Sequence, residues 1–249
     1  MLCDGAKMSI PGLSEWLSTP PGRYISVWEQ AKHDHLVADI FGFNAIQIGM
    51  VECDFLRANR MPLRVRCESQ GSANVISDPN HLPFAGTSVD LVVLPHVLEF
   101  ADTPHQILRE VERILVPEGQ IIITGFNPFS MWGVRRGLMR NGAGFPWQGH
   151  YLSILRLKDW LALLGFEIQL GSFGCYAPAA NQDKWLRRWQ FLERAGDRWW
   201  PIAGAVYVVQ AVKRVHGMRL ITPVWRERKA RAKALAPAVQ RFDRDSAVH

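Results

Sequence analysis

The sequence predicts an α/β domain in which a mostly parallel, doubly wound sheet carries helices on both faces. Two runs, residues 90–94 (DLVVL) and 120–124 (QIIIT), are apolar on both strand faces, which is typical of strands buried in a parallel sheet. A helical pattern lies between them, and strand, helix, strand in this order is the crossover unit that joins parallel strands. Strand and helix patterns alternate almost to the end of the chain, and no linker marks a second domain.

The segment before residue 44 predicts a short lead-in and then one long helix. Pro11-Gly12 and Pro20-Pro21-Gly22 interrupt residues 1–22 too densely for a long element, although residues 13–17 could form one turn. From Arg23 onward, apolar residues recur at spacings of three and four, which predicts an amphipathic helix ending at Gly42. The predicted stripe is Tyr24, Val27, Trp28, Ala31, His35, Leu36 and Ile40.

Further short elements complete the pattern. Apolar runs bounded by Gly, Pro, Asn or Ser predict strands at 44–48, 63–67 and 74–76. Later in the chain a helix is predicted at 155–164, followed by strands at 166–170 and 205–212. With the two buried runs, the sequence therefore predicts seven strands.

The helix of the crossover unit has clear start and stop signals. Thr103 with Gln106 forms a capping-box pattern, and Pro104 stands at the first helical position. The Pro-Glu-Gly sequence at 117–119 predicts where the helix stops. Its apolar stripe is Ile107, Leu108, Val111, Ile114 and Leu115.

Basic charge is concentrated at the end of the chain. The net charge is +6, yet the residues from Lys213 onward hold ten Lys or Arg and three acidic residues, and the preceding part carries a net −1. We expect a lead-in at 1–22, a near-neutral domain at 23–214 with insertion or lid segments at 129–150 and 176–200, and a tail at 215–249. Residues 213–244 would bind RNA or an anionic surface, or else remain solvated and disordered.

Several classes of protein are disfavoured by composition. No apolar run reaches the roughly 18 residues that span a bilayer, and the start lacks the layout of a signal peptide, so we expect a cytoplasmic protein without a transmembrane segment. Cys3, Cys53, Cys67 and Cys175 form no CxxC pair, so no metal site is predicted. We expect buried thiols in a reducing compartment, with a catalytic Cys as the alternative.

The stretch from His81 to Thr124 resembles the second half of the type 11 class I S-adenosylmethionine-dependent methyltransferase domain, with the motifs in the same order along its whole length. The matching positions are Leu82-Pro83-Phe84, Asp90, His96-Val97-Leu98-Glu99, and Arg113-x-Leu115-x-Pro117-x-Gly119. A weaker likeness to the family extends over Arg23 to Arg214. The whole chain, including Gly125-Phe126-Asn127-Pro128 and its apolar and basic end, looks similar to a bacterial group of short methyltransferase-like proteins with a degenerate glycine loop. The resemblance implies a Rossmann-like seven-stranded sheet and S-adenosyl-L-methionine as cofactor.

The loop after the first strand departs from that family. The family pattern there is Asp-x-Gly-x-Gly-x-Gly, and this chain has Gln47-Ile48-Gly49-Met50-Val51-Glu52-Cys53, in which only the first glycine is present. Side chains at Val51 and Cys53 would obstruct a close approach of the ligand, and Gln47 has no carboxylate for its ammonium group. The resemblance therefore implies weakened or altered cofactor binding.

Two acidic residues match positions that hold the adenosine part of the cofactor in the family. Glu68 follows the predicted strand at 63–67 and would accept hydrogen bonds from the ribose hydroxyls, or else be simply solvated. Asp78 would bind the adenine amino group, or else start an Asp-Pro turn. The full set of positions that the resemblance assigns to the cofactor is Gln47, Gly49, Glu68, Asp78, His81, Leu82, Leu94, Pro95 and His96.

His96 is the candidate for catalysis. It follows the fourth strand, where the resemblance implies that the methyl group faces the acceptor, and an imidazole is suited to proton transfer. The alternative is that His96 only lines the pocket. Glu99 would cap or orient the following helix.

Residues after the fifth strand are candidates for the acceptor side. Asn127 in the Gly-Phe-Asn-Pro sequence would contact the acceptor, or else belong to a turn that leaves the sheet. Trp132 and Arg135 would form the wall for a flat or anionic acceptor, or else a lid packed on the domain. A second group of aromatic and basic residues would belong to an interface, a membrane surface or the core; it consists of Trp185, Trp189, Trp199, Trp200, Arg187, Arg188, Arg194 and Arg198.

Two functions follow from these observations. The first is transfer of a methyl group from S-adenosylmethionine to an unidentified small-molecule or macromolecular acceptor. The second is a non-catalytic binding module that keeps the fold and interacts with RNA through its basic tail. The degenerate loop at 49–53 favours the second function, and Asp78 and His96 favour the first.

Overall fold

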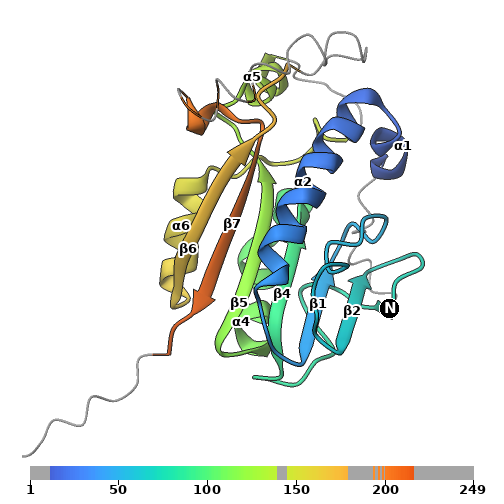
Figure 1. Ribbon diagram of the computed structural model, residues 1–249, viewed down its shortest axis with the longest axis vertical. Coiled ribbons are helices and arrows are strands. Elements are labelled where there is room, and N and C mark those ends of the chain that lie inside the picture. Colours follow the sequence, from blue (N-terminus) through green and yellow to red (C-terminus); the bar gives the residue numbers. More distant parts are fainter. Residues whose placement is uncertain are drawn as a thin grey trace, which may run out of the picture. The chain divides into compact units, whose positions relative to one another are not determined.

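Figure 1 shows the computed structural model, which describes residues 12–138, 145–178, 193, 196, 198 and 200–215. These residues belong to a compact unit that ends at Val215. Its seven strands form one sheet in the order β3-β2-β1-β4-β5-β7-β6. The predicted α/β class with a doubly wound, mostly parallel sheet is confirmed.

The strands lie close to their predicted positions. All pairings from β3 across to β5 are parallel, whereas β7 runs antiparallel between β5 and β6. The mixed edge arises because β7, last in the chain, inserts beside β5. The bounds are β1 Asn44–Ile48, β2 Leu63–Glu68, β3 Val75–Ile76, β4 Val89–Pro95, β5 Leu115–Phe126, β6 Phe166–Gly174 and β7 Val206–Lys213.

Helices cover both faces of the sheet. In Figure 1, α2 (Pro20–Ala38) crosses one face, while α4 (Pro104–Ile114) and α6 (Ile154–Leu163) lie on the other. Separate buried clusters fill the two interfaces, as expected when each sheet face packs against its own helix layer. In the described part of the chain, no helix has the length and apolar character needed to cross a membrane. The shorter elements are α1 Leu13–Leu17, α3 Val97–Phe100, α5 Met131–Leu138 and the 3-10 turn η1 Pro201–Ala203.

The long N-terminal helix begins earlier than predicted. Pro20 and Pro21 occupy the first positions of α2, and the Thr19 side chain accepts a hydrogen bond from the Gly22 N–H at 3.3 Å. Proline is tolerated there because the first N–H groups of a helix have no partner within the helix. The Pro-Pro-Gly sequence therefore starts the helix instead of interrupting the chain, and the predicted start at Arg23 is wrong.

The buried face of α2 also differs from the predicted stripe. Val27, Ala31 and His35 are exposed, whereas Glu29 and His33 are buried beside the apolar residues of the helix. The prediction placed apolar side chains inward, but two polar residues take those positions. They are buried because they find hydrogen-bond partners on β4, α3 and β5, which are described below.

The start of α4 is correct, but its capping box does not form. The Thr103 hydroxyl donates to Asn80 Oδ1 at 2.7 Å and makes no hydrogen bond that caps the helix. At the other end, the helix stops at Ile114 and β5 begins at Leu115, before the Pro-Glu-Gly sequence. Thr103 therefore ties α4 to the loop after β3 instead of satisfying the first turn of the helix.

Packing of α4 on the sheet predicts unequal effects for two neighbouring residues. Leu108 is fully buried in the core and Arg109 is exposed. We expect Leu108→Ala to lower the free energy of unfolding by about 2–5 kcal/mol through the cavity that it leaves, and Arg109→Ala to change it by less than about 0.5 kcal/mol. Urea denaturation measures both, and equal effects would contradict the placement of the helix.

Candidate functional site

The carboxyl ends of five strands lie at one end of the sheet, and a candidate residue lies at or shortly after each of them. Gly49 follows β1, His96 follows β4 and Asn127 follows β5. Glu68 is the last residue of β2, and Asp78 comes shortly after β3. This end holds the carboxyl ends of the parallel strands, beside the reversal of strand order between β1 and β4, where doubly wound sheets bind ligands.

Gln47 holds the loop after β1 from inside the domain. Its Nε2 donates to the carbonyl oxygens of Gly49 (3.1 Å), Met50 (3.0 Å) and Cys53 (2.8 Å). Its Oε1 accepts a hydrogen bond from the Phe55 N–H at 3.0 Å, and the side chain is fully buried. The partners fix the orientation of the amide, because carbonyls need a donor and an N–H needs an acceptor. In this conformation Gln47 organises the loop and does not face a ligand.

The loop is a compact left-handed turn in which side chains fill the space that glycines leave open in the family pattern. Gly49 has φ 81°, and a Cβ added there would lie 2.7 Å from Val97 Cγ2, so glycine is required. Met50 has φ 47° and is buried in the same cluster as α2. The side chain of Met50 thus takes part in the core on the side where the methionine part of a cofactor would lie.

His96 lies between two carboxylates. Its Nδ1 is 2.9 Å from Glu99 Oε2 and its Nε2 is 2.6 Å from Glu29 Oε1, and all three side chains are 1% exposed. The Glu99 carboxylate also accepts a hydrogen bond from the backbone N–H of Phe126. The backbone N–H of His96 donates to the Thr124 carbonyl at 3.0 Å. We refer to Glu29, His96 and Glu99 as the Glu–His–Glu cluster. It connects α2, the β4–α3 junction and the end of β5.

Electrostatics favour a protonated ring in this cluster. Burial alone would lower the pKa of His96, but the facing carboxylates of Glu29 and Glu99 outweigh it and raise the pKa to about 10. Burial raises the pKa of Glu99, while its hydrogen bond to His96 opposes that shift. With both ring nitrogens donating to carboxylates, His96 has no nitrogen available to act as a base in this conformation.

A second histidine extends the polar contacts. His33 Nδ1 lies 2.8 Å from the Glu29 carbonyl, and its Nε2 lies 3.1 Å from Thr124 Oγ1. A carbonyl can only accept, so Nδ1 carries the proton and a neutral Nε2 accepts from the hydroxyl. Burial lowers the pKa of His33, which agrees with a neutral ring. Helix α2 is therefore fixed to the sheet by polar as well as apolar contacts.

The predicted adenosine residues lie at the carboxyl ends of β2 and β3. Glu68 is buried, and burial together with the charge of Glu52 raises its pKa to about 7. No hydrogen bond or ion pair among the described residues reaches its carboxylate. Asp78 Oδ1 accepts hydrogen bonds from the Asn80 N–H (2.9 Å) and Nδ2 (3.0 Å), which is the turn that the sequence offered as the alternative to adenine binding.

The remaining predicted cofactor positions differ in exposure. His81 is exposed, with its Nδ1 3.6 Å from Asp78 Oδ2. Leu82, Leu94 and Pro95 are buried, and the first two belong to the cluster that α4 covers. The structure thus places these four residues near the expected strand ends, and only His81 offers an accessible side chain.

Two of the predicted acceptor residues, Asn127 and Trp132, are buried where they connect separate segments of the chain. Asn127 Nδ2 donates to the carbonyls of Ile202 (2.6 Å) and Gly204 (2.9 Å), and Oδ1 accepts from the Phe129 N–H at 3.0 Å. Trp132 is 1% exposed and its Nε1 donates to a backbone carbonyl, that of Ala177, at 2.9 Å. These contacts match the alternatives of a turn and a packed lid.

An aromatic group closes this end of the sheet. Phe126, Trp16 of α1 and Phe145 lie within 4.8–6.4 Å of one another, centroid to centroid. Arg135 stacks over the Trp147 ring at 5.2 Å. Tyr151 stacks on Phe126 at 5.1 Å, and its buried hydroxyl has no hydrogen-bond partner among the described residues.

Several predictions fall outside the described residues. These are the basic tail from residue 216 onward, Cys3, and the second group of aromatic and basic residues apart from Arg198 and Trp200. Cys53, Cys67 and Cys175 are free, and burial raises the pKa of each thiol, so none is activated as a nucleophile. No group of three metal-ligating side chains occurs in the described part of the chain.

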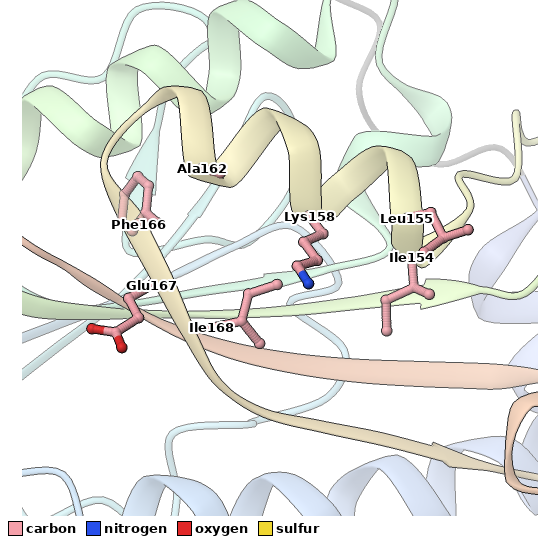
Figure 2. Close-up of a pocket in the computed structure, with 7 residues that line it drawn as sticks. All are labelled: Ile154, Leu155, Lys158, Ala162, Phe166, Glu167 and Ile168. Atoms are coloured by element: carbon pink, nitrogen blue, oxygen red, sulfur yellow. The ribbon is translucent and has the colours of Figure 1, made fainter.

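A hollow of about 470 Å³ lies elsewhere, between α6 and the edge strand β6. Figure 2 shows it along one side of α6, with Lys158 directed toward Ile168. The residues that line it include none of the predicted site residues; they are Ile154, Leu155, Lys158, Ala162, Phe166, Glu167 and Ile168.

Sequence reasoning missed Glu29. It lies in α2, far along the chain from His96, and no motif marks it. The available signal was a polar residue at a position four before His33, on the face that also carries Ile25 and Leu36. Charged residues at buried helix positions indicate a partner elsewhere in the fold.

The geometry agrees with what comparison with known proteins finds. Residues 49–123 match the family model described as a methyltransferase domain, of type 11. This part of the chain is therefore similar to type 11 methyltransferase domains. The match covers nearly all of the stretch from His81 to Thr124, and solved methyltransferase structures share the fold, so the resemblance predicted from that stretch is confirmed.

Two curated relatives match part of this chain. The uncharacterized protein YafS of Escherichia coli is 36% identical over 131 residues, or 52% of this chain and 55% of the relative. The uncharacterized protein MJ1123 of Methanocaldococcus jannaschii is 29% identical over 100 residues, 40% of this chain and 49% of the relative. The chain thus spans about half the length of the curated relatives that it matches.

Solved structures share the fold over most of the chain. A chain in the complex of the Haloferax volcanii Trm112 methyltransferase activator with a methyltransferase has a TM-score of 0.58 at 18% identity, covering 83% of this chain and 98% of that one. A methyltransferase of Thermotoga maritima also scores 0.58, at 15% identity, covering 81% and 94%. The [4+2]-cyclase SpnF scores 0.51, at 15% identity, covering 78% and 83%. The same fold therefore carries more than one chemistry.

The contacts of Gln47 predict that the acidic residue of the family pattern cannot be restored. We expect Gln47→Glu to lower the free energy of unfolding by at least about 2 kcal/mol, because it places a buried carboxylate against three carbonyl oxygens. Urea denaturation measures the change. Gln169→Glu, at an exposed position of β6, is the matched control and should be nearly neutral; equal effects would contradict the assigned contacts.

The Glu–His–Glu cluster predicts a pH dependence. Since the pKa of His96 rises from its ordinary 6.5 to about 10, its contribution to stability is complete below pH 6.5 and is lost as the pH rises through about 10. We expect the melting temperature to fall over this range more steeply in the wild type than in Glu29→Gln, where one carboxylate is gone. Glu15→Gln, an exposed change, should keep the wild-type slope; parallel slopes in all three proteins would refute the assignment.

Proposed function

We propose that this chain binds S-adenosylmethionine and transfers its methyl group to an acceptor. The observation that carries the proposal is Glu68, a largely buried carboxylate at the carboxyl end of β2 to which no described residue donates a hydrogen bond. A carboxylate in that state needs hydrogen-bond donors, and the two hydroxyls of a ribose supply them. The proposal therefore rests on an acceptor available to a ligand as well as on the fold.

The residues at the β2 and β3 ends fit the adenosine part of the cofactor. Glu68 would accept from the ribose hydroxyls, and Asp78 retains Oδ2 for an adenine amino group, with only the exposed His81 at 3.6 Å beside it. Gly49 lets the backbone turn close to the ligand with φ 81°. These three residues form the adenosine half of the proposed site.

The methionine half is closed in this conformation. Met50, Phe126 and Phe145 are buried together, and both nitrogens of His96 are bonded to carboxylates. The residues fit a cofactor here only after Phe145 and the N-terminal part of α2 move away from the strand ends. We infer that the closed arrangement belongs to the ligand-free state, and that α1 and α2 open when the cofactor enters.

When bound, the cofactor supplies a methyl group on a positively charged sulfur. A lone pair of the acceptor can attack the methyl carbon in line with the carbon–sulfur bond, and the sulfur leaves with the electrons of that bond. The chain would contribute by position and by exclusion of water, for which the aromatic group around Phe126 is suited. Tyr151 Oη, which is buried and has no hydrogen-bond partner among the described residues, would hydrogen-bond the acceptor. His96, held by Glu29 and Glu99, would act as a positioning residue for the strand end rather than as a base.

Calorimetric titration with S-adenosylmethionine and with S-adenosylhomocysteine tests the proposal. We expect binding, weaker by about tenfold or more in Glu68→Gln, because a carboxylate that accepts two hydrogen bonds is replaced by an amide. Glu167→Gln, at the other edge of the sheet, should bind like the wild type. No heat and no thermal shift at millimolar ligand would overturn the proposal.

The pH dependence of that affinity gives a further check on Glu68. The raised pKa of about 7 means that Glu68 becomes ionised as the pH passes through 7, so the wild type should bind more tightly at pH 8 than at pH 6. Glu68→Gln should lose this difference. If the variant keeps it, another group controls the affinity.

A further inference from the structure

A second apolar surface, which the proposed methyl transfer does not use, lies on α5 and beside it. Large apolar side chains at least half exposed occur on two segments that meet there. Asn127 joins the segments, because its side chain donates to the Ile202 carbonyl and accepts from the Phe129 N–H. We call this surface the α5 patch; it consists of Phe129, Met131, Val134, Leu138, Trp200 and Ile202.

Helix α5 is apolar on two sides, and only one of them serves the core. Trp132 is 1% exposed and anchors the helix through its hydrogen bond to the Ala177 carbonyl. Met131, Val134 and Leu138 are spaced by three and four residues, so they share a face, and that face is exposed. Core packing therefore explains Trp132 and leaves the outer face unexplained. Figure 1 shows α5 beyond the carboxyl end of β5.

The charges around the patch are all of one sign along this segment. Residues 127–138 include Arg135 and Arg136 and no Asp or Glu. The guanidinium of Arg135, the residue after Val134, stacks over Trp147 at 5.2 Å. Arg136, one helical turn after the buried Trp132, stacks over Tyr151 at 4.9 Å on the core side of the helix. Close to Trp200 in sequence, Arg198 is exposed, and Glu193 and Asp197 precede it in the same segment.

We propose that the α5 patch docks on an anionic lipid surface. Exposed Phe, Trp, Leu, Ile, Met and Val beside arginines, without acidic residues on the helix, is the composition of helices that lie in a membrane interface. The apolar side chains would enter the boundary between headgroups and acyl chains, and the arginines would contact lipid phosphates. A protein partner would need an apolar surface surrounded by acidic residues. An anionic bilayer has both features by composition, so we favour the lipid surface.

Vesicle binding by the full chain tests the docking. Sedimentation is measured with vesicles of phosphatidylcholine alone and with about 30% phosphatidylglycerol, at an ionic strength of about 0.1 M. We expect binding to the anionic vesicles, and a partition constant at least about tenfold lower in the double variant Val134→Gln/Leu138→Gln, since each buried Val or Leu contributes at least that factor. Both residues are exposed, so the change should leave the fold intact.

The matched control is Leu155→Gln/Leu163→Gln, two exposed leucines of α6. It should bind the vesicles like the wild type. Because all of these proteins keep the basic residues from Lys213 onward, a loss confined to the α5 variant isolates the patch from any contribution of the tail.

Three results would overturn the proposal. One is the absence of wild-type binding to anionic vesicles, and another is equal binding by the α5 variant. The third is a wild-type dimer, detected by sedimentation velocity, that the α5 variant dissociates without a change in vesicle binding, since a second copy would then cover the patch. Titration with S-adenosylmethionine, without vesicles, reports separately on the proposed methyl transfer.

Discussion

The placement of a histidine between two buried glutamates controls the arrangement of the whole ligand end. Three ionisable side chains at 1% exposure are costly to bury unless each satisfies the others, and here the ring donates to both carboxylates. His96 adopts φ 54° at the start of α3, a conformation uncommon for a side chain with a Cβ, and the two carboxylates hold it there. Since Glu29 lies on α2 and Glu99 also binds the Phe126 N–H, one cluster fixes a helix, a turn and a strand end.

The two halves of the proposed cofactor site consequently differ in physical character. The adenosine half depends on Glu68, whose carboxylate accepts no hydrogen bond from a described residue, while the methionine half is filled by side chains that pack against one another. Ligand binding then competes with contacts that the protein makes with itself. Such competition lowers the apparent affinity by the free energy of opening, without any loss of the contacts made once the site is open. A degenerate glycine loop and a functional site are therefore compatible in thermodynamic terms.

The sequence predicted the framework well because strands and the crossover helix are local patterns. The runs around Val92 and Ile122 are apolar on both faces in any context, so their burial follows from composition. The candidate site could not be predicted to the same depth. Glu29 contacts His96 only because tertiary packing brings α2 against the end of β4. The hydrogen bonds of Gln47 depend on the directions of the carbonyl groups in the loop after β1. The predicted stripe of α2 was wrong for the same reason, since hydrogen-bond partners on other elements outweighed hydrophobic periodicity.

The position of β7 has a consequence for synthesis on the ribosome. Strand β6 bonds only to β7 in the sheet, and β7 also supplies the partner that β5 needs on its outer side. While the nascent chain is still shorter than residue 206, the parallel half from β3 to β5 can assemble, but the side of β5 that will receive β7 stays open and β6 has no place to bind. The domain thus leaves the exit tunnel with an unpaired strand edge, a state in which chaperones or neighbouring chains have access to it.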